Sequence, residues 1–196
     1  MSNALPITVL VAIAIFLLKE TLEFVKKNRT ESRKIKAYKY ILSEELEKNN
    51  YIISTLKRSL KDIESDFDEY QISLSKTNEG ISLISFTRKQ DGGKSTGPLP
   101  ETHSSVFNKI FVEIAALDEE LFNLAAEAYA GIAEVGHVRR SLIDYVVHKD
   151  EHPEDILVPF SSYGIEVLDD SHEKICALYR KCTGNELKIH KIRSYV

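Results

Sequence analysis

The chain has 196 residues, of which 43% are hydrophobic and 29% are charged, and its formal net charge at pH 7 is -4. This balance is typical of a folded chain and excludes a disordered one. The acidic net charge also disfavours nucleic acid as a partner.

The first predicted element is an apolar segment, ALPITVLVAIAIFLL at residues 4–18, which contains no charged side chain. A bilayer core of ~30 Å needs about 20 helical residues, with roughly 17 as the lower limit, and residues 1–18 reach that limit. We therefore predict a single transmembrane anchor at residues 1–25. A buried core helix is disfavoured because the segment is apolar on every side. A signal peptide is disfavoured because basic residues follow the segment instead of preceding it.

Basic residues follow the apolar segment directly. Eight Lys or Arg residues lie between residues 19 and 39, against three Glu residues. The positive-inside rule then predicts a single-pass protein of the inner (plasma) membrane, with the N-terminus outside and the C-terminal part in the cytoplasm. The expected partners are the lipid bilayer and its anionic headgroups. The residues predicted to lie at the membrane surface are Lys19, Lys26, Lys27, Arg29, Arg33 and Lys34.

Residues 26–70 are predicted to form one long juxtamembrane helix, because they lack Gly and Pro and their apolar residues recur mostly at steps of three and four. The stripe predicts a parallel homo-oligomer, and its alternative interpretation is the ordinary core of the chain's own bundle. Asn49 and Asn50 interrupt the stripe as either a polar layer or a bend. The predicted association residues are Ile35, Leu42, Leu46, Ile52 and Leu56.

One part of this helix resembles a known kind of sequence. KAYKYILSEELEKNNYIISTL, at residues 36–56, resembles uncharacterised bacterial single-pass membrane proteins in which an anchor precedes a helix with an E-[LI]-E-x-N motif. Glu45, Leu46, Glu47 and Asn49 carry the motif here. LDEELFNLAAEAYAGI, at residues 117–132, is similar to a second helix of such proteins. The resemblance implies a membrane-tethered helical domain and adds no catalytic residue.

Residues 71–100 are predicted to be an irregular segment and a loop, with a possible short strand at residues 81–86. Residues 91–100 contain three Gly and two Pro, which predicts a loop. Gly93-Lys94-Ser95 matches the end of a phosphate-binding loop. However, Arg88 stands where the first Gly should be, and Gly97-Pro98 prevents the helix that should follow. We therefore predict a surface loop without a nucleotide.

Residues 101–196 are predicted to form a helical bundle that residues 26–70 complete. The expected helices cover residues 105–116, a span from 119 to before His152, and a span from 161 or 165 to 182, with Asp118 and Gly184 as caps. The fold class is mainly α, an antiparallel bundle of four or five helices. Residues 187–193 are a possible strand, a docking segment or a lipid contact.

Two residue pairs have the i, i+4 spacing of metal ligands on a helix, His148 with His152 and His172 with Cys176. Metal is disfavoured because Pro153 disturbs the first pair and no second pair with ligand spacing accompanies either. Cys176 and Cys182 are otherwise expected to be buried or half-buried thiols.

No catalytic motif is found, and no cofactor is predicted. We predict a non-catalytic, membrane-tethered interaction or scaffold module that acts through a protein partner or self-association. The alternatives are a membrane-perturbing effector of a stress or phage-defence system and an enzyme with an unrecognised site.

Overall fold

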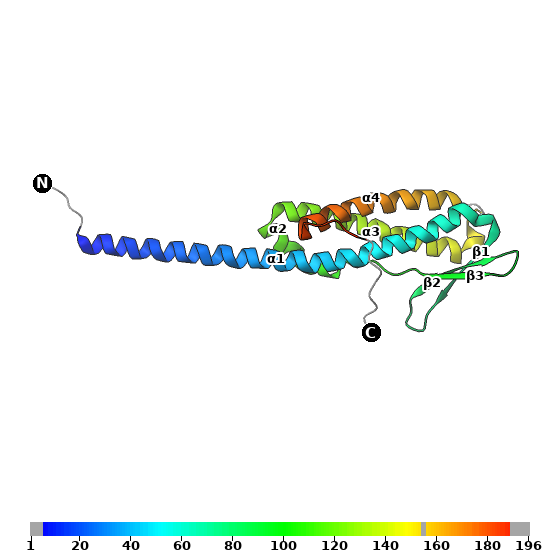
Figure 1. Cartoon of the computed structure of the whole chain (residues 1–196), viewed down its shortest axis with the longest axis horizontal. Helices are drawn as coiled ribbons and strands as arrows, with labels where there is room; N and C mark the ends of the chain where they lie inside the picture. Colours follow the sequence, from blue (N-terminus) through cyan, green and yellow to red (C-terminus); the bar gives the residue numbers. More distant parts are fainter. Residues whose placement is uncertain (1–5, 154–155, 189–196) are drawn as a thin grey trace. The chain divides into compact units, whose positions relative to one another are not determined.

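The computed structural model describes residues 6–153 and 156–188, and these residues form four α-helices and one three-stranded antiparallel sheet (Figure 1). The predicted mainly helical fold is therefore confirmed. The chain divides into two compact units, Met1–Tyr38 and Lys39–Val196, which are described separately.

Helix α1 extends over Ile7–Asp66, a length of 60 residues. Neither Gly nor Pro occurs within it, so nothing interrupts the backbone hydrogen bonds. Pro6 precedes the first turn, and its carbonyl accepts a hydrogen bond from the N–H of Val9 at 2.9 Å. The helix continues through Asn49 and Asn50, so these residues do not separate two helices, which was one of the two interpretations considered for them.

The apolar start of α1 was expected to cross a membrane. Among the helices in residues 6–153 and 156–188, none is both long enough and apolar enough to span a bilayer.

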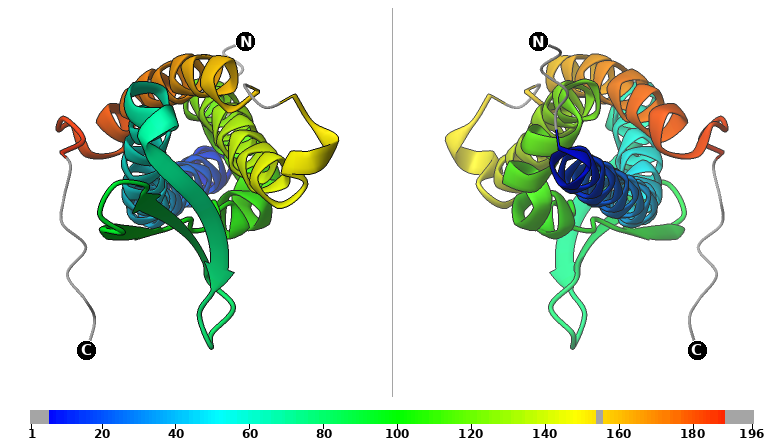
Figure 2. Two further views of the ribbon diagram at one scale, coloured as in Figure 1. Left: turned by 90° about the vertical axis from the view of Figure 1, so that its right-hand side faces the viewer. Right: turned by 90° about the vertical axis from the view of Figure 1, so that its left-hand side faces the viewer.

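The second unit is built from α1 after Tyr38, α2 (Ser105–Leu117), α3 (Glu119–Val147) and α4 (Leu157–Thr183). In Figures 1 and 2, α3 and α4 run antiparallel, and both lie beside this part of α1. Their apolar stripes fill the shared interior. The side chains of this core with 0% exposure include Leu42, Leu46, Leu60, Ile63, Leu121, Leu142, Leu168, Ile175 and Leu178.

The ends of these helices follow their sequence signals. Asp118 caps α3, because its Oδ1 accepts a hydrogen bond from the N–H of Leu121 at 2.9 Å, as predicted. Gly184 ends α4 in the left-handed conformation with φ 74°, also as predicted. Helix α4 begins earlier than expected, at Leu157. Pro159 is tolerated there because the first turn of a helix needs no N–H donor at that position.

Residues 70–98 form a meander of three antiparallel strands, β1 (Tyr70–Lys76), β2 (Ser82–Arg88) and β3 (Lys94–Pro98), in the order β1-β2-β3. Ile84 and Phe86 on the central strand are buried, with 0% and 5% exposure. The short strand predicted at residues 81–86 is confirmed within β2. The predicted loop at residues 91–100 is wrong for Lys94–Pro98, which pairs with β2.

This error has a physical cause. The positive φ needed for the second turn is supplied by Gly92 alone, at 72°. Gly97 and Pro98 lie on an edge strand, where glycine and proline are tolerated. The strand considered near residues 187–193 falls mostly outside the described residues, and Leu187 and Lys188 belong to no strand.

Helices α3 and α4 approach each other closely at a glycine. A Cβ added to Gly131 would lie 3.2 Å from the Cα of Ser171, and the Ser171 hydroxyl donates a 3.1 Å hydrogen bond to the Gly131 carbonyl. The absence of a side chain at Gly131 therefore lets α4 approach α3 closely at this crossing.

Candidate functional site: an apolar helix with a basic flank

The first unit exposes apolar side chains along residues 7–25 of α1. Twelve large apolar side chains there are exposed, and the exposed fractions of Ile7, Leu22 and Phe24 are 79%, 69% and 64%. Consecutive residues 15–18, Ile-Phe-Leu-Leu, are all more than half exposed, so the apolar surface surrounds the helix. A surface of this kind marks a site that binds lipid or protein.

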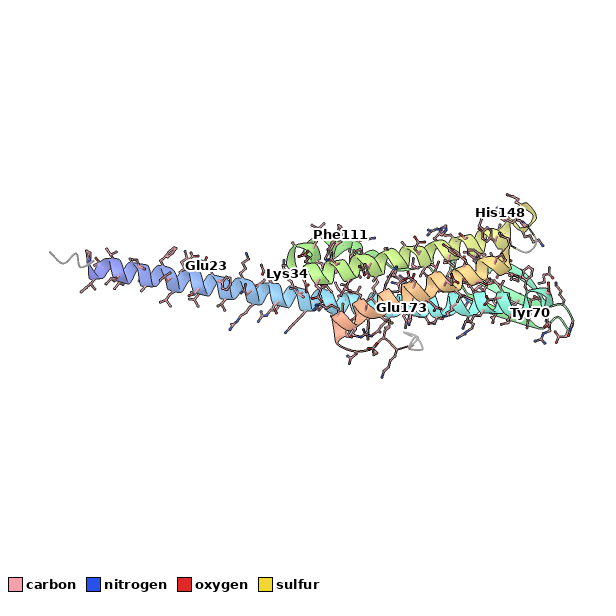
Figure 3. All side chains as sticks on the ribbon, turned by 90° about the horizontal axis from the view of Figure 1, so that it is seen from above. Glu23, Lys34, Tyr70, Phe111, His148 and Glu173 are labelled. Carbon is pink, nitrogen blue, oxygen red and sulfur yellow. The ribbon has the colours of Figure 1, made fainter. Side chains whose placement is uncertain are left out.

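The residues predicted to lie at the membrane surface are all exposed on the same helix, in the first unit. Lys19 pairs with Glu23 at 3.8 Å and Lys27 with Glu31 at 4.0 Å. The side chains of Glu23 and Lys34 project from α1 in Figure 3. Arg29 and Arg33, by contrast, have no acidic partner among the described residues.

The E-[LI]-E-x-N motif lies in the second unit and forms a buried polar cluster. The Glu45 side chain is 3% exposed. Its Oε1 accepts from the N–H of Val106 at 2.9 Å, and its Oε2 accepts from the N–H of Phe107 at 3.3 Å and from the Tyr129 hydroxyl at 2.5 Å. Ser104 makes no side-chain capping hydrogen bond, so the cap of α2 comes from α1, about 60 residues earlier in the chain.

Asn49 of this motif and the adjacent Asn50 bind backbone segments. Asn49 is 1% exposed and pairs with His103 in both directions, donating from Nδ2 to its carbonyl at 2.7 Å and accepting its N–H at 2.8 Å. Asn50 donates from Nδ2 to the carbonyl of Lys188 at 3.3 Å. These residues are thus the polar layer considered for this position, and they attach the segment before α2 and the segment after α4 to α1.

Two tyrosines complete the cluster. Burial and, secondly, the hydrogen bond to Glu45 raise the pKa of Tyr129. Tyr179 donates a 2.8 Å hydrogen bond to Glu47, and burial followed by this bond raises its pKa. Both phenols therefore stay protonated near neutral pH and act as donors that join α3 and α4 to α1.

Four of the five predicted association residues lie in the core of the second unit. The exposed fractions of Leu42 and Leu46 are 0%, and those of Ile52 and Leu56 are 2%. Ile35, in the first unit, is half-buried. The four core side chains correspond to the alternative interpretation, ordinary bundle core, because the chain's own helices already cover them.

Of the pairs considered for metal, His148 and His152 both contact Asp144, whereas His172 and Cys176 contact each other. His148 Nδ1 lies 3.0 Å from one oxygen of Asp144, and His152 Nε2 lies 3.5 Å from the other. His172 Nε2 lies 3.5 Å from the Cys176 sulfur, and burial raises the pKa of that thiol. No group of three or more potential ligands that could hold a metal ion is found in the described part of the chain.

Lys94 of the phosphate-loop fragment is exposed at the start of β3, where no helix follows it. The arrangement therefore lacks the helix N-terminus whose N–H groups would bind phosphate.

The buried cluster around Glu45 was missed in the sequence. Its signal is the position of Asn49, which falls in the apolar repeat between Leu46 and Ile53, where a polar side chain must be buried and hydrogen-bonded.

Comparison of the chain with known protein families, with curated proteins and with solved structures finds no match.

Proposed function

We propose that this protein is a membrane-tethered helical interaction module, non-catalytic, which presents its second unit at the inner face of a membrane. The observation that carries the proposal is the apolar surface of residues 7–25, exposed in the first unit on all sides of α1. Complete burial of one large apolar side chain is worth about 1.5–3 kcal/mol, so twelve of them provide a strong drive into lipid.

The orientation in this proposal comes from charge. The first unit beyond residue 18 is rich in Lys and Arg, and none of the residues before the apolar segment is basic. The segment rich in Lys and Arg that follows the apolar residues stays in the cytoplasm, so the N-terminus lies outside. A reporter enzyme fused after Val196 should then show cytoplasmic activity, and activity on the other side of the membrane would overturn the orientation.

The second unit supports an associative role. Its buried polar groups, Glu45 and Asn49, are occupied by contacts that hold the fold together. Residues 39–196 carry 27 Asp or Glu and 19 Lys or Arg, so this unit attracts a basic protein surface. Purification of the full chain in detergent should recover a stoichiometric protein partner or a defined self-assembly, and a monomer without either would contradict this part.

The tether is tested by flotation of the full chain with phosphatidylcholine vesicles. Ile13→Asp with Phe16→Asp should abolish flotation, because two carboxylates in an inserted helix cost about 5–7 kcal/mol. The matched control replaces two exposed apolar residues of the second unit, Val112→Asp with Val147→Asp, which are 72% and 56% exposed. The control should float like the unchanged chain. Equal behaviour of the two variants would refute the tether.

A further inference from the structure

The side-chain amide of Asn50 on α1 is only half used by the described part of the chain. Its Nδ2 donates a 3.3 Å hydrogen bond to the carbonyl of Lys188. Its Oδ1 is buried and accepts no hydrogen bond from any described residue, and the whole residue is 2% exposed. A buried oxygen without a donor is costly and rare in folded proteins, so Asn50 calls for a further partner.

The adjacent Asn49 shows the complete form of such a contact. Its Nδ2 and Oδ1 bond the carbonyl and the N–H of one backbone residue, His103, at 2.7 Å and 2.8 Å. Asn50 binds the carbonyl of Lys188 in the same way but lacks the matching N–H. In an extended segment, every second residue directs its N–H and C=O to the same side. The N–H of His190 is therefore the next donor on the side of Asn50.

The structure describes the chain as far as Lys188, and residues 189–196, here called the tail, follow it. We propose that the tail continues from Lys188 as an extended segment that docks along α1 and α4, with the N–H of His190 on Oδ1 of Asn50. Among the roles considered for the end of the sequence, this one is the docking segment. The docking concerns the second unit alone, so its test is independent of the tether.

The residues before the tail alternate in exposure as an extended segment does. Leu187 is half-buried, whereas Glu186 and Lys188 on either side of it are exposed. The same alternation, continued by one more step, puts Ile189 on the side of Leu187. The tail therefore begins with an apolar side chain directed at the protein, which favours docking over a free end.

The direction of the chain after α4 sets the path. Three contacts fix the register of the antiparallel helices α1 and α4, those of Glu47 with Tyr179, Lys57 with Asp169 and Glu64 with Ser162. By this register, Thr183 at the end of α4 is level with Ser43, and Asn50 is level with Cys176. Between Thr183 and Lys188 the chain thus runs along α1 toward higher residue numbers, and the tail continues in that direction.

Charge favours this path. At ~3.3 Å per residue, Arg193 of the tail lies about 17 Å beyond Lys188, and at ~1.5 Å per residue, Glu166 lies about 15 Å from Cys176 along α4. Glu166 and Glu173 are exposed and have no ion pair among the described residues; Glu173 is labelled on α4 in Figure 3. The tail contains two Lys or Arg and no Asp or Glu. Its charge is therefore complementary to the carboxylates that it passes.

The docking is tested by hydrogen exchange of the full chain in detergent, measured by mass spectrometry. The backbone N–H groups of the tail should exchange on the order of tenfold more slowly than those of a free peptide of the same sequence. Asn50→Leu removes both hydrogen bonds of the amide and should bring the tail to the rate of the free peptide. A tail that exchanges at that rate in the unchanged chain would overturn the docking.

A second variant changes only exposed residues, so the fold is retained. Glu166→Gln with Glu173→Gln should accelerate exchange in the tail roughly threefold, because two exposed ion pairs are lost. The matched control, Glu127→Gln with Glu134→Gln, removes the same charge from exposed positions of α3 and should leave the tail unchanged. Equal rates in these two variants would overturn the path along α4.

Two other partners of the tail give different results in the same measurement. If a second copy of the chain holds the tail, protection increases with protein concentration. If lipid holds it, protection appears only with vesicles that contain phosphatidylglycerol and persists in Asn50→Leu. Either result would overturn the docking. Protection that is the same at low and high protein concentration, with and without vesicles, and that is lost in Asn50→Leu supports it.

Discussion

The phenol of Tyr129 on α3 donates a hydrogen bond to Oε2 of Glu45 on α1, and both side chains are buried. The same carboxylate accepts two backbone N–H groups at the start of α2. Three helices therefore meet at one carboxylate, and Phe107 stacks on the Tyr129 ring with centroids 4.2 Å apart.

Glu45→Ala should lower the free energy of unfolding by about 3–5 kcal/mol, because it leaves a buried hydroxyl, a buried N–H group and a part-buried N–H group without their acceptor. Urea denaturation measures the change. Glu44→Ala is the control, because Glu44 is exposed on the same turn, and it should change the free energy by less than about 0.5 kcal/mol. Equal effects of the two substitutions would show that Glu45 does not join the helices.

Stability should decrease as the pH rises above about 10. The pKa of Tyr129 is raised in the folded state, chiefly by burial, so the unfolded chain loses this proton first. The stability that comes from the protonated phenol is complete below pH 10 and is lost at higher pH. Unfolding midpoints measured from pH 8 to 11 should fall less steeply for Tyr129→Phe than for the unchanged chain, and parallel curves would contradict this assignment.

Gly131→Ala should destabilise the protein by about 1–2 kcal/mol, although alanine is the better helix former by about 1 kcal/mol. The new methyl would lie 3.2 Å from the backbone of Ser171, so α3 and α4 must separate. Thermal unfolding followed by circular dichroism measures this change. Ala133→Gly, at an exposed position of α3, is the control for helix propensity alone. A stabilised Gly131→Ala variant would show that α3 and α4 can accommodate a methyl group at this crossing.

Cys182 should react slowly with iodoacetamide at pH 8. Burial raises the pKa of this thiol to about 11, against an ordinary value of 9.0, so the thiolate fraction falls about 100-fold. The measurement uses a Cys176→Ala chain, in which Cys182 is the single thiol, and compares its alkylation rate in buffer and in urea. The same rate in both conditions would contradict a protected thiol.

The helices were predictable because their signals are local. Asp118 and Gly184 cap their helices in the structure as in the sequence, and the apolar steps of three and four mark the buried stripes. The third strand was not predictable from its own residues, because KSTGP has little strand propensity and is held by pairing with β2.

The candidate site was predictable in part. The exposed apolar segment and its basic flank can be read directly from composition. The role of Glu45 could not be, because its partners, Val106 and Tyr129, lie 61 and 84 residues away in the sequence. The sequence also could not decide whether Leu42 and Leu46 belong to the chain's own core or to an oligomer interface. The same apolar stripe fits both arrangements, and the residues that cover it are distant in the sequence.

The long interval in the sequence between α1 and the helices that cover it, α3 and α4, has a consequence for synthesis on the ribosome. The buried stripe of α1 is complete once Ile63 has been made, but the helices that cover it end at Val147 and Thr183. At 5–20 residues per second, the gap of about 120 residues between Ile63 and Thr183 takes about 6–24 s to translate. During that interval the nascent α1 exposes the stripe without its cover, so chains released early should be bound by chaperones, and only chains that include α4 should escape them.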